Sequence, residues 1–167
     1  MAVKLEAWVT EAFSAASWGD LEPLKNLVDC STPEWAVLRD VKQDLANVRD
    51  RMDGMKTLLH VTSINGNTDA VKLLIEKGAV VNVIDSEGNT PLIRSAGCGD
   101  SHLAISKMLI ENCKDTKSMV NRINVEKLTA LDAAMAEGSN SDEGGVETVK
   151  LLQKSGAASA KGAGAAR

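Results

Sequence analysis

The feature that most constrains this chain is an internal repeat with a period of about 33 residues. Thr57 in "TLLHVTSINGN" and Thr90 in "NTPLIRSAGCG" are 33 positions apart, and the same step separates Gly66 from Gly99. Each threonine begins a short run of apolar and small residues, each glycine ends it, and a second apolar run follows. A unit this short cannot bury its apolar side alone, so the copies must stack on their neighbours.

Two further copies extend the pattern in both directions. A step of 39 residues from Thr90 reaches Thr129 in "TALDAAMAEGS", which is followed by "VETVKLLQKSGA" after a longer turn. A step of 47 residues back from Thr57 reaches Thr10, with Gly19 at the glycine position. The first copy keeps little else of the pattern. We therefore expect four repeats, the first of them degenerate, with approximate bounds 5–30, 53–84, 85–123 and 124–157.

Each copy is predicted to form a helix, a tight glycine turn and a second helix. The second helix carries an apolar stripe at helical spacing, as in Val71, Leu74 and Ile75. Thr90 followed by Pro91 is a helix-start signal, because threonine can cap the first turn and proline has no N–H to leave unpaired. The expected fold is an all-α solenoid of helix-turn-helix units with short β-hairpin-like connections.

These motifs resemble the ankyrin repeat family. "GNTPL" at 88–92 is similar to the family's G-x-T-P-L opening, "LLIEKGA" at 73–79 to its L-L-x-x-G-A close, and "VN" at 81–82 to the V-N that follows. His60 lies where the family keeps a structural histidine that hydrogen-bonds the local backbone, whereas Ile93 and Asp132 replace it in the third and fourth copies. The resemblance implies stacked repeats that bind other proteins.

The stretch between the first two copies does not repeat. Thr32-Pro33-Glu34 is a helix-start signal. Apolar residues at spacings of three and four follow it, namely Trp35, Leu38, Val41, Leu45, Val48 and Met52. This pattern predicts an inserted helix within 31–52, beginning near residue 33, that either packs back on the repeats or completes a groove for a partner helix. Residues 158–167 are rich in glycine and alanine and are expected to form a flexible tail.

The sequence gives little support for catalytic or metal-binding chemistry. "GCGD" at 97–100 lacks the spacing of a phosphate-binding loop, and the cysteines and histidines do not occur at zinc-ligand spacing. Cys98 near His102 leaves a small thiol-dependent enzyme as the rival class, but a reactive cysteine needs surroundings that lower its pKa. We therefore expect a protein that is not an enzyme, with no catalytic residue, cofactor site or metal site.

Charge and cysteine usage restrict the partners and the compartment. The net charge is -4, and basic residues do not cluster, so nucleic-acid binding is not expected. Three scattered cysteines indicate a reducing compartment rather than a disulfide framework. The N-terminal residues do not read as a secretory signal, and no stretch approaches the roughly 20 apolar residues of a membrane span. We expect an intracellular, most simply cytoplasmic, protein without membrane insertion.

The resemblance also implies where a partner binds. In the family, hairpin tips and the two residues before the helix-ending glycine form the binding surface. Carried over by position, the contact residues here are Trp18, Ile64, Asn65, Ser86, Glu87, Asn89, Cys98, Glu126 and Glu137. Trp35 of the inserted helix is a further candidate. An exposed tryptophan is a typical energetic anchor, although Trp18 can also be a cap residue that covers the first helix pair.

The glutamates in this set favour a partner with a basic contact surface. The predicted function is a protein–protein interaction module, an adaptor or accessory subunit of a larger assembly. The alternative within the same class is an inhibitor that blocks the surface of a partner enzyme.

Overall fold

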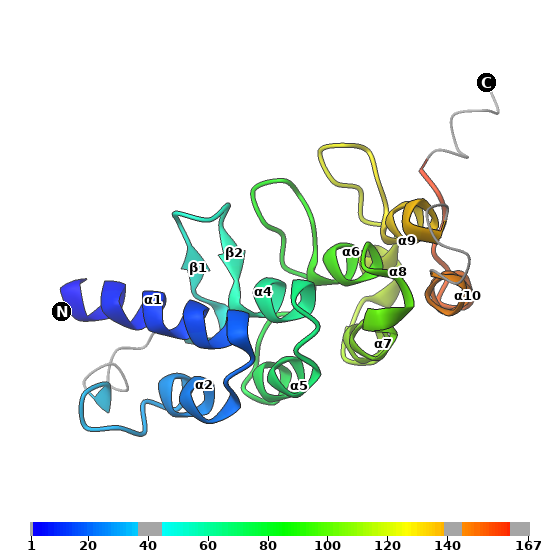
Figure 1. The fold of residues 1–167 in the computed structure, drawn as a ribbon. Helices are drawn as coiled ribbons and strands as arrows, with labels where there is room; N and C mark the ends of the chain where they lie inside the picture. The colour runs from blue at the N-terminus through cyan, green and yellow to red at the C-terminus, as the bar shows by residue number, and fades with distance from the viewer. Residues whose placement is uncertain (1, 37–44, 139–144, 161–167) are drawn as a thin grey trace. The chain divides into compact units, whose positions relative to one another are not determined.

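The computed structural model describes residues 2–36, 45–138 and 145–160. Its contacts divide the chain into two compact units, Met1–Val80 and Val81–Arg167. Both units consist of short helices joined by turns, and the strands among the described residues form one two-stranded ribbon (Figure 1). The predicted all-α class with helix-turn-helix units is therefore confirmed.

Two helix pairs pack in two layers within residues 1–80. The pairs are α1 (Ala2–Trp18) with α2 (Leu21–Val28), and α4 (Leu58–Ile64) with α5 (Thr68–Glu76). α1 packs against α4 and α2 packs against α5, so the first helices form one layer and the second helices the other (Figure 1). Burial of apolar side chains between the layers is the main driving force for this arrangement. The fully buried side chains include Trp8, Leu24, Leu27, Leu58 and Leu74.

The predicted helix start at Thr90 is confirmed in α6 (Pro91–Ala96). Thr90 Oγ1 accepts a hydrogen bond from the N–H of Ile93 at 3.2 Å, and proline occupies the first turn. The glycines that follow the first helices also behave as predicted. Gly19, Gly66 and Gly99 have φ angles of +73°, +75° and +66°. A side chain disfavours this left-handed conformation, so the turn geometry itself requires glycine.

The residue three positions after the threonine completes the cap. The N–H of Thr57 donates to His60 Nδ1 at 3.2 Å, which confirms the structural role of this histidine. In α9 (Ala130–Gly138), Asp132 Oδ2 accepts from the N–H and the hydroxyl of Thr129 at 3.0 and 2.8 Å. An aspartate thus makes the contact that a histidine makes in the second repeat, but it brings a negative charge to the start of the helix.

The predicted helix over 33–52 is wrong in its second half, and residues 37–44 of it lie outside the described residues. Leu45–Asn47 forms a 3-10 turn (η1), and Arg49–Asp50 forms strand β1, antiparallel to β2 (Lys56–Thr57). The side chain of Asp50 accepts from the N–H of Met52 at 2.8 Å, an aspartate turn that competes with helix. A helix-start signal and apolar spacing predicted a helix, but turn-forming residues determine the structure of residues 49–55.

Asn47 shows to which repeat this segment belongs. Its Oδ1 accepts from the N–H of Val80 at 2.6 Å, and its Nδ2 donates to the carbonyl of Gly78 at 3.1 Å. Asn121, in a later repeat, accepts from the N–H of Ala158 at 2.8 Å in the same manner. The two asparagines are therefore structurally equivalent. The β1–β2 hairpin after Asn47 is the connecting hairpin at the end of the first repeat.

Residues 81–167 repeat the layered packing. α6 packs against α7 (Leu103–Glu111) and α9, and α9 packs against α10 (Val146–Lys154). A 3-10 turn, η2 (Gly99–His102), leads into α7, and α8 (Thr116–Val120) follows it. The fully buried side chains of this unit include Leu92, Ile105, Leu109, Met119 and Leu152.

Asp100, the aspartate of the "GCGD" turn, caps a helix in the next repeat. Its carboxylate accepts from the N–H groups of Glu147 and Thr148 at 3.1 and 2.7 Å, and from the Thr148 hydroxyl at 2.8 Å. Negative charge at a helix N-terminus satisfies unpaired donors and interacts favourably with the helix dipole. Burial raises the pKa of Asp100, but these hydrogen bonds outweigh it and lower the pKa below its usual value.

Residues 158–160, the first part of the predicted flexible tail, are held by hydrogen bonds to Asp132 and Asn121. The N–H of Ala160 donates to Asp132 Oδ2 at 2.9 Å, and the Ser159 hydroxyl donates to Asp132 Oδ1. Burial raises the pKa of Asp132, but the hydrogen bonds from Ser159, Thr129 and Ala160 outweigh it and lower the pKa to about 2. The carboxylate of Asp132, which lies where the second repeat has His60, thus holds residues 158–160. Residues 161–167 lie outside the described residues.

Candidate protein-binding surface

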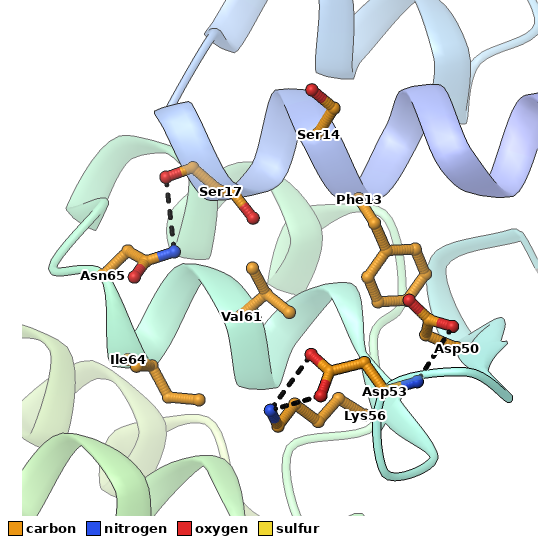
Figure 2. A pocket seen from close by; sticks show the side chains of 9 residues that line it. All are labelled: Phe13, Ser14, Ser17, Asp50, Asp53, Lys56, Val61, Ile64 and Asn65. Atoms are coloured by element: carbon orange, nitrogen blue, oxygen red, sulfur yellow. Dashed lines mark hydrogen bonds and ion pairs between the residues drawn. The ribbon is translucent and has the colours of Figure 1, made fainter.

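A surface pocket of about 320 Å³ lies within residues 1–80. Its walls come from the last turns of α1, from the β1–β2 hairpin and from α4 (Figure 2). The lining residues are Phe13, Ser14, Ser17, Asp50, Asp53, Lys56, Val61, Ile64 and Asn65. Two residues predicted to contact a partner, Ile64 and Asn65, belong to this lining. A concave site with an apolar part and a few convergent polar groups is the usual form of a binding pocket.

Hydrogen bonds hold the polar walls of the pocket in place. Asn65 Nδ2 donates to the carbonyl of Ser17 at 3.2 Å and so connects α4 to α1 (Figure 2). Lys56 Nζ lies 2.8 and 3.0 Å from the two carboxylate oxygens of Asp53. The N–H of Asp53 donates to Asp50 Oδ1 at 3.3 Å. A partner therefore meets walls that are already ordered, which lowers the entropic cost of binding.

Gly19 sets the distance between α1 and the second repeat. Asn67 Nδ2 donates to the carbonyls of Ala16 and Ser17 at 2.8 and 3.3 Å. A Cβ on Gly19 would lie only 2.8 Å from the Asn67 side chain. The glycine is required for its positive φ and also for this close approach. The same turn positions the end of α1 beside the pocket.

Trp18 is 80% exposed and directly follows the pocket residue Ser17. This exposure excludes the alternative in which Trp18 covers the first helix pair. Met52, at the tip of the hairpin that forms another wall, is 95% exposed. Large apolar side chains exposed beside a pocket are typical of protein-binding surfaces.

Trp35 has the opposite environment. It is 5% exposed, so it belongs to the core of the unit and offers almost no surface to a partner. Its burial favours the interpretation in which the segment after the first helix pair packs on the chain's own residues. The proposed contact role of Trp35 is therefore corrected to a core role. Apolar spacing could not separate the two interpretations, because a core stripe and a binding stripe have the same period.

The turn residues of the unit 81–167 have mixed environments. Ser86, Glu87 and Glu126 are exposed, in agreement with a surface role. Asn89 is only 4% exposed, and its Oδ1 accepts from Asn124 Nδ2 at 2.8 Å. A buried amide that joins two consecutive turns is a structural link, so the contact role proposed for Asn89 is corrected as well.

Arg94 on α6 organises the turn that carries Glu87. Its guanidinium donates to Asp85 Oδ2 at 2.7 and 3.0 Å and to Glu87 Oε2 at 2.9 Å. Burial raises the pKa of Asp85, but the hydrogen bonds from Arg94 and from the N–H groups of Asn89 and Glu87 outweigh it and lower the pKa. The charge of Glu87 is partly compensated by Arg94, which weakens the acidic character of this rim.

The remaining candidates lie on the turn after α6 and in α9. Cys98 is half-buried, and its thiol donates to the carbonyl of Arg94 at 3.5 Å. His102 Nδ1 lies 2.8 Å from the hydroxyl of Ser101. The side chain of Glu137 lies outside the described residues. No cluster of histidine, cysteine and acidic side chains suited to a metal ion occurs within 2–36, 45–138 and 145–160.

A family profile described as ankyrin repeats, in three copies, matches residues 12–119, well over half of the chain. The chain belongs to the ankyrin repeat family. The match starts inside α1, so it includes most of the degenerate first ankyrin repeat. Across the part of the chain that the structure describes, no helix is long and apolar enough to cross a membrane.

Several curated proteins share part of these ankyrin repeats. Human ankyrin repeat domain-containing protein 63 is 34% identical over 92 residues, which are 55% of this chain and 23% of the relative. Mouse protein phosphatase 1 regulatory subunit 12A is 41% identical over 106 residues, 60% of this chain and 10% of the relative. A putative ankyrin repeat protein of Rickettsia bellii is 45% identical over 58 residues. The chain spans about a quarter or less of the length of these relatives.

The sequence interpretation missed most of the pocket. Phe13, Asp50, Asp53 and Lys56 line it, yet none was among the predicted contact residues. Asp50 was assigned to the inserted helix, and Asp53 and Lys56 were assigned to the start of the second repeat. Asn47 is the signal that could have corrected this, because "AN" at 46–47 precedes "VN" at 81–82 by 35 residues. That step is close to the ankyrin repeat period and places a hairpin directly after Asn47.

Proposed function

We propose that this ankyrin repeat chain is a non-catalytic protein-interaction module that serves as an adaptor or accessory subunit of a larger assembly. The observation that carries the proposal is the pocket of about 320 Å³, together with the exposed Trp18 that directly follows its lining residue Ser17. Its walls are the first helices and a hairpin, the elements from which the family resemblance predicted a binding surface. The partner's contact surface is proposed to be basic.

Quantitative capture with surface variants tests this function. The tagged full chain is compared with Trp18→Ala, Ile64→Ala and the control Val80→Ala, whose side chain is exposed but does not line the pocket. The proposal expects one set of co-purifying proteins to decrease with Trp18→Ala and with Ile64→Ala and to persist with the control. Circular dichroism verifies that each variant is folded. Capture of the same proteins by all three variants would contradict the proposal.

A second candidate is regulation of a partner enzyme by covering part of its surface. The observation that favours it is the 41% identity to a protein named as a regulatory subunit of protein phosphatase 1. Since the match covers 10% of that relative, any phosphatase partner is a proposal for this chain. Titration of purified protein phosphatase 1 catalytic subunit with the chain tests it: binding that Ile64→Ala weakens supports the candidate, and no binding at micromolar concentration excludes it.

A further inference from the structure

The pocket within residues 1–80 combines an apolar floor with a charged rim. The ring of Phe13 and the side chains of Val61 and Ile64 form its apolar part, and Asp50 and Asp53 approach from the hairpin (Figure 2). Phe13 and Val61 are themselves 7% and 8% exposed, so the chain's own core supports this floor. A ligand group must therefore match both an apolar surface and a carboxylate edge.

The charge of the lining is negative. Two aspartates and one lysine line the pocket, which leaves a formal charge of −1. Lys56 is held at 2.8 Å by Asp53, and its side chain is only 21% exposed, so it forms part of the wall. The Asp53 side chain remains 60% exposed. Asp50 is held at the rim because its Oδ1 accepts from the N–H groups of Met52 and Asp53 at 2.8 and 3.3 Å.

Lysine and arginine are the side chains whose structure matches this lining. Both have an aliphatic stem that packs on apolar surface while the charged end stays near water and carboxylates. A cation is also attracted to the face of an aromatic ring such as that of Phe13. A purely apolar group would take solvation from the aspartates without compensating their charge, and an acidic group would be repelled.

We infer that this pocket binds an arginine or lysine side chain of a partner protein segment, with Asp50 and Asp53 as the charge-recognising residues and Phe13 as the surface for the stem. The inference rests on the proposed protein-binding function and assigns the partner's chemistry.

Selection from a random nonapeptide phage library on the immobilised full chain tests the inference. The wild type is compared with the double variant Asp50→Asn/Asp53→Asn. The matched control is Asp69→Asn/Glu76→Gln, which makes the same change in net charge on exposed residues of α5 that do not line the pocket. We expect arginine and lysine to be enriched about threefold or more on the wild type and on the control, and not on the pocket variant.

The contribution of the basic residue to binding is then measured with a single selected peptide. Its basic residue is replaced by citrulline or norleucine, which remove the charge, and Kd is measured by fluorescence anisotropy. Replacement is expected to weaken binding about fivefold or more on the wild type, and by much less on Asp50→Asn/Asp53→Asn, because the two changes remove the same interaction. If removing the charge weakens peptide binding equally on the wild type and on Asp50→Asn/Asp53→Asn, the inference is overturned.

The outcomes also separate this inference from the proposed function. Selected peptides without basic enrichment, whose capture nevertheless depends on Ile64, overturn the basic ligand and keep the binding surface. Basic enrichment that persists on Asp50→Asn/Asp53→Asn overturns the assignment of these two residues. If the wild type selects no peptides at all, both proposals fail.

Discussion

The side-chain oxygen of Asn47 accepts a hydrogen bond from the backbone N–H of Val80 at 2.6 Å, although the two residues are 33 positions apart. Together with the bond from Asn47 Nδ2 to the carbonyl of Gly78, this contact attaches the end of the first repeat to the end of the second. Such contacts between equivalent positions hold consecutive repeats in register, because each repeat is stabilised mainly by its neighbours.

Asn47→Ala removes both bonds and is expected to lower the free energy of unfolding by about 1–2 kcal/mol. Urea denaturation measures the change. Asn112→Ala is the matched control, because the side chain of Asn112 is exposed and donates to the carbonyl of Met108 in the preceding turn. Its expected cost is below about 0.5 kcal/mol. Equal small effects of the two substitutions would show that the asparagine contact between repeats is not stabilising.

Asp132→Asn tests the charge that holds residues 158–160. The pKa of Asp132 is lowered to about 2 from 3.8, so its contribution to stability is complete above the unfolded pKa and disappears as the pH falls through the folded pKa. We expect the variant to be less stable than the wild type by about 1–2 kcal/mol at pH 7, and this difference to shrink between about pH 4 and pH 2. Urea denaturation at fixed pH values measures it. A difference that does not depend on pH contradicts the assignment.

Asp100→Ala removes the cap that the third repeat provides for α10. The expected loss of unfolding free energy is about 1–2 kcal/mol, as for other N-terminal caps. Hydrogen exchange should accelerate first at the amides of Glu147 and Thr148, which donate to Asp100. Glu111→Ala, at an exposed position on α7, is the control and should leave these amides protected.

Arg94→Met leaves Asp85 buried without its cation. The Asp85 side chain is only 1% exposed and that of Arg94 is 25% exposed, so we expect a loss of about 2–3 kcal/mol at pH 7. In the variant, Asp85 loses the hydrogen bonds and the charge of Arg94 that lower its pKa, so its pKa rises relative to that in the wild type. The deficit should therefore shrink as the pH falls toward about 4 and the carboxyl takes up a proton. Lys107→Met breaks an exposed pair 3.9 Å apart and should cost less than about 0.5 kcal/mol.

The stability effects of replacing Trp35, which is buried, and Trp18, which is exposed, can be compared directly. Trp35→Ala is expected to lower the unfolding free energy by about 3–5 kcal/mol, because it opens a cavity in the core. Trp18→Ala should change it by less than about 0.5 kcal/mol, because the side chain is 80% exposed. Thermal and urea denaturation distinguish the two. A large destabilisation by Trp18→Ala would assign this residue to the fold instead of the binding surface.

Much of the fold could be predicted because the helix caps and turns of a repeat depend on interactions between residues that are close in sequence. Thr90 and Pro91 start a helix, Gly66 and Gly99 close turns, and His60 bonds the backbone of its own cap. Each of these interactions spans only a few residues, and the threonine and the glycine recur at the same positions in several repeats. The same recurrence placed Ile64 and Asn65 on the surface where the pocket lies.

The helix starts and turns of the second and third repeats follow from the residues alone, because they depend on contacts within a few residues. Contacts between distant segments are fixed by the packing of the folded chain: Asn47 binds Val80, Trp35 is buried while Trp18 is exposed, and Asp50 and Asp53 meet Phe13 in one pocket. Periodic apolar spacing does not reveal whether a stripe faces the core or a partner. Burial depends on which surfaces meet, and that is a property of the packed chain.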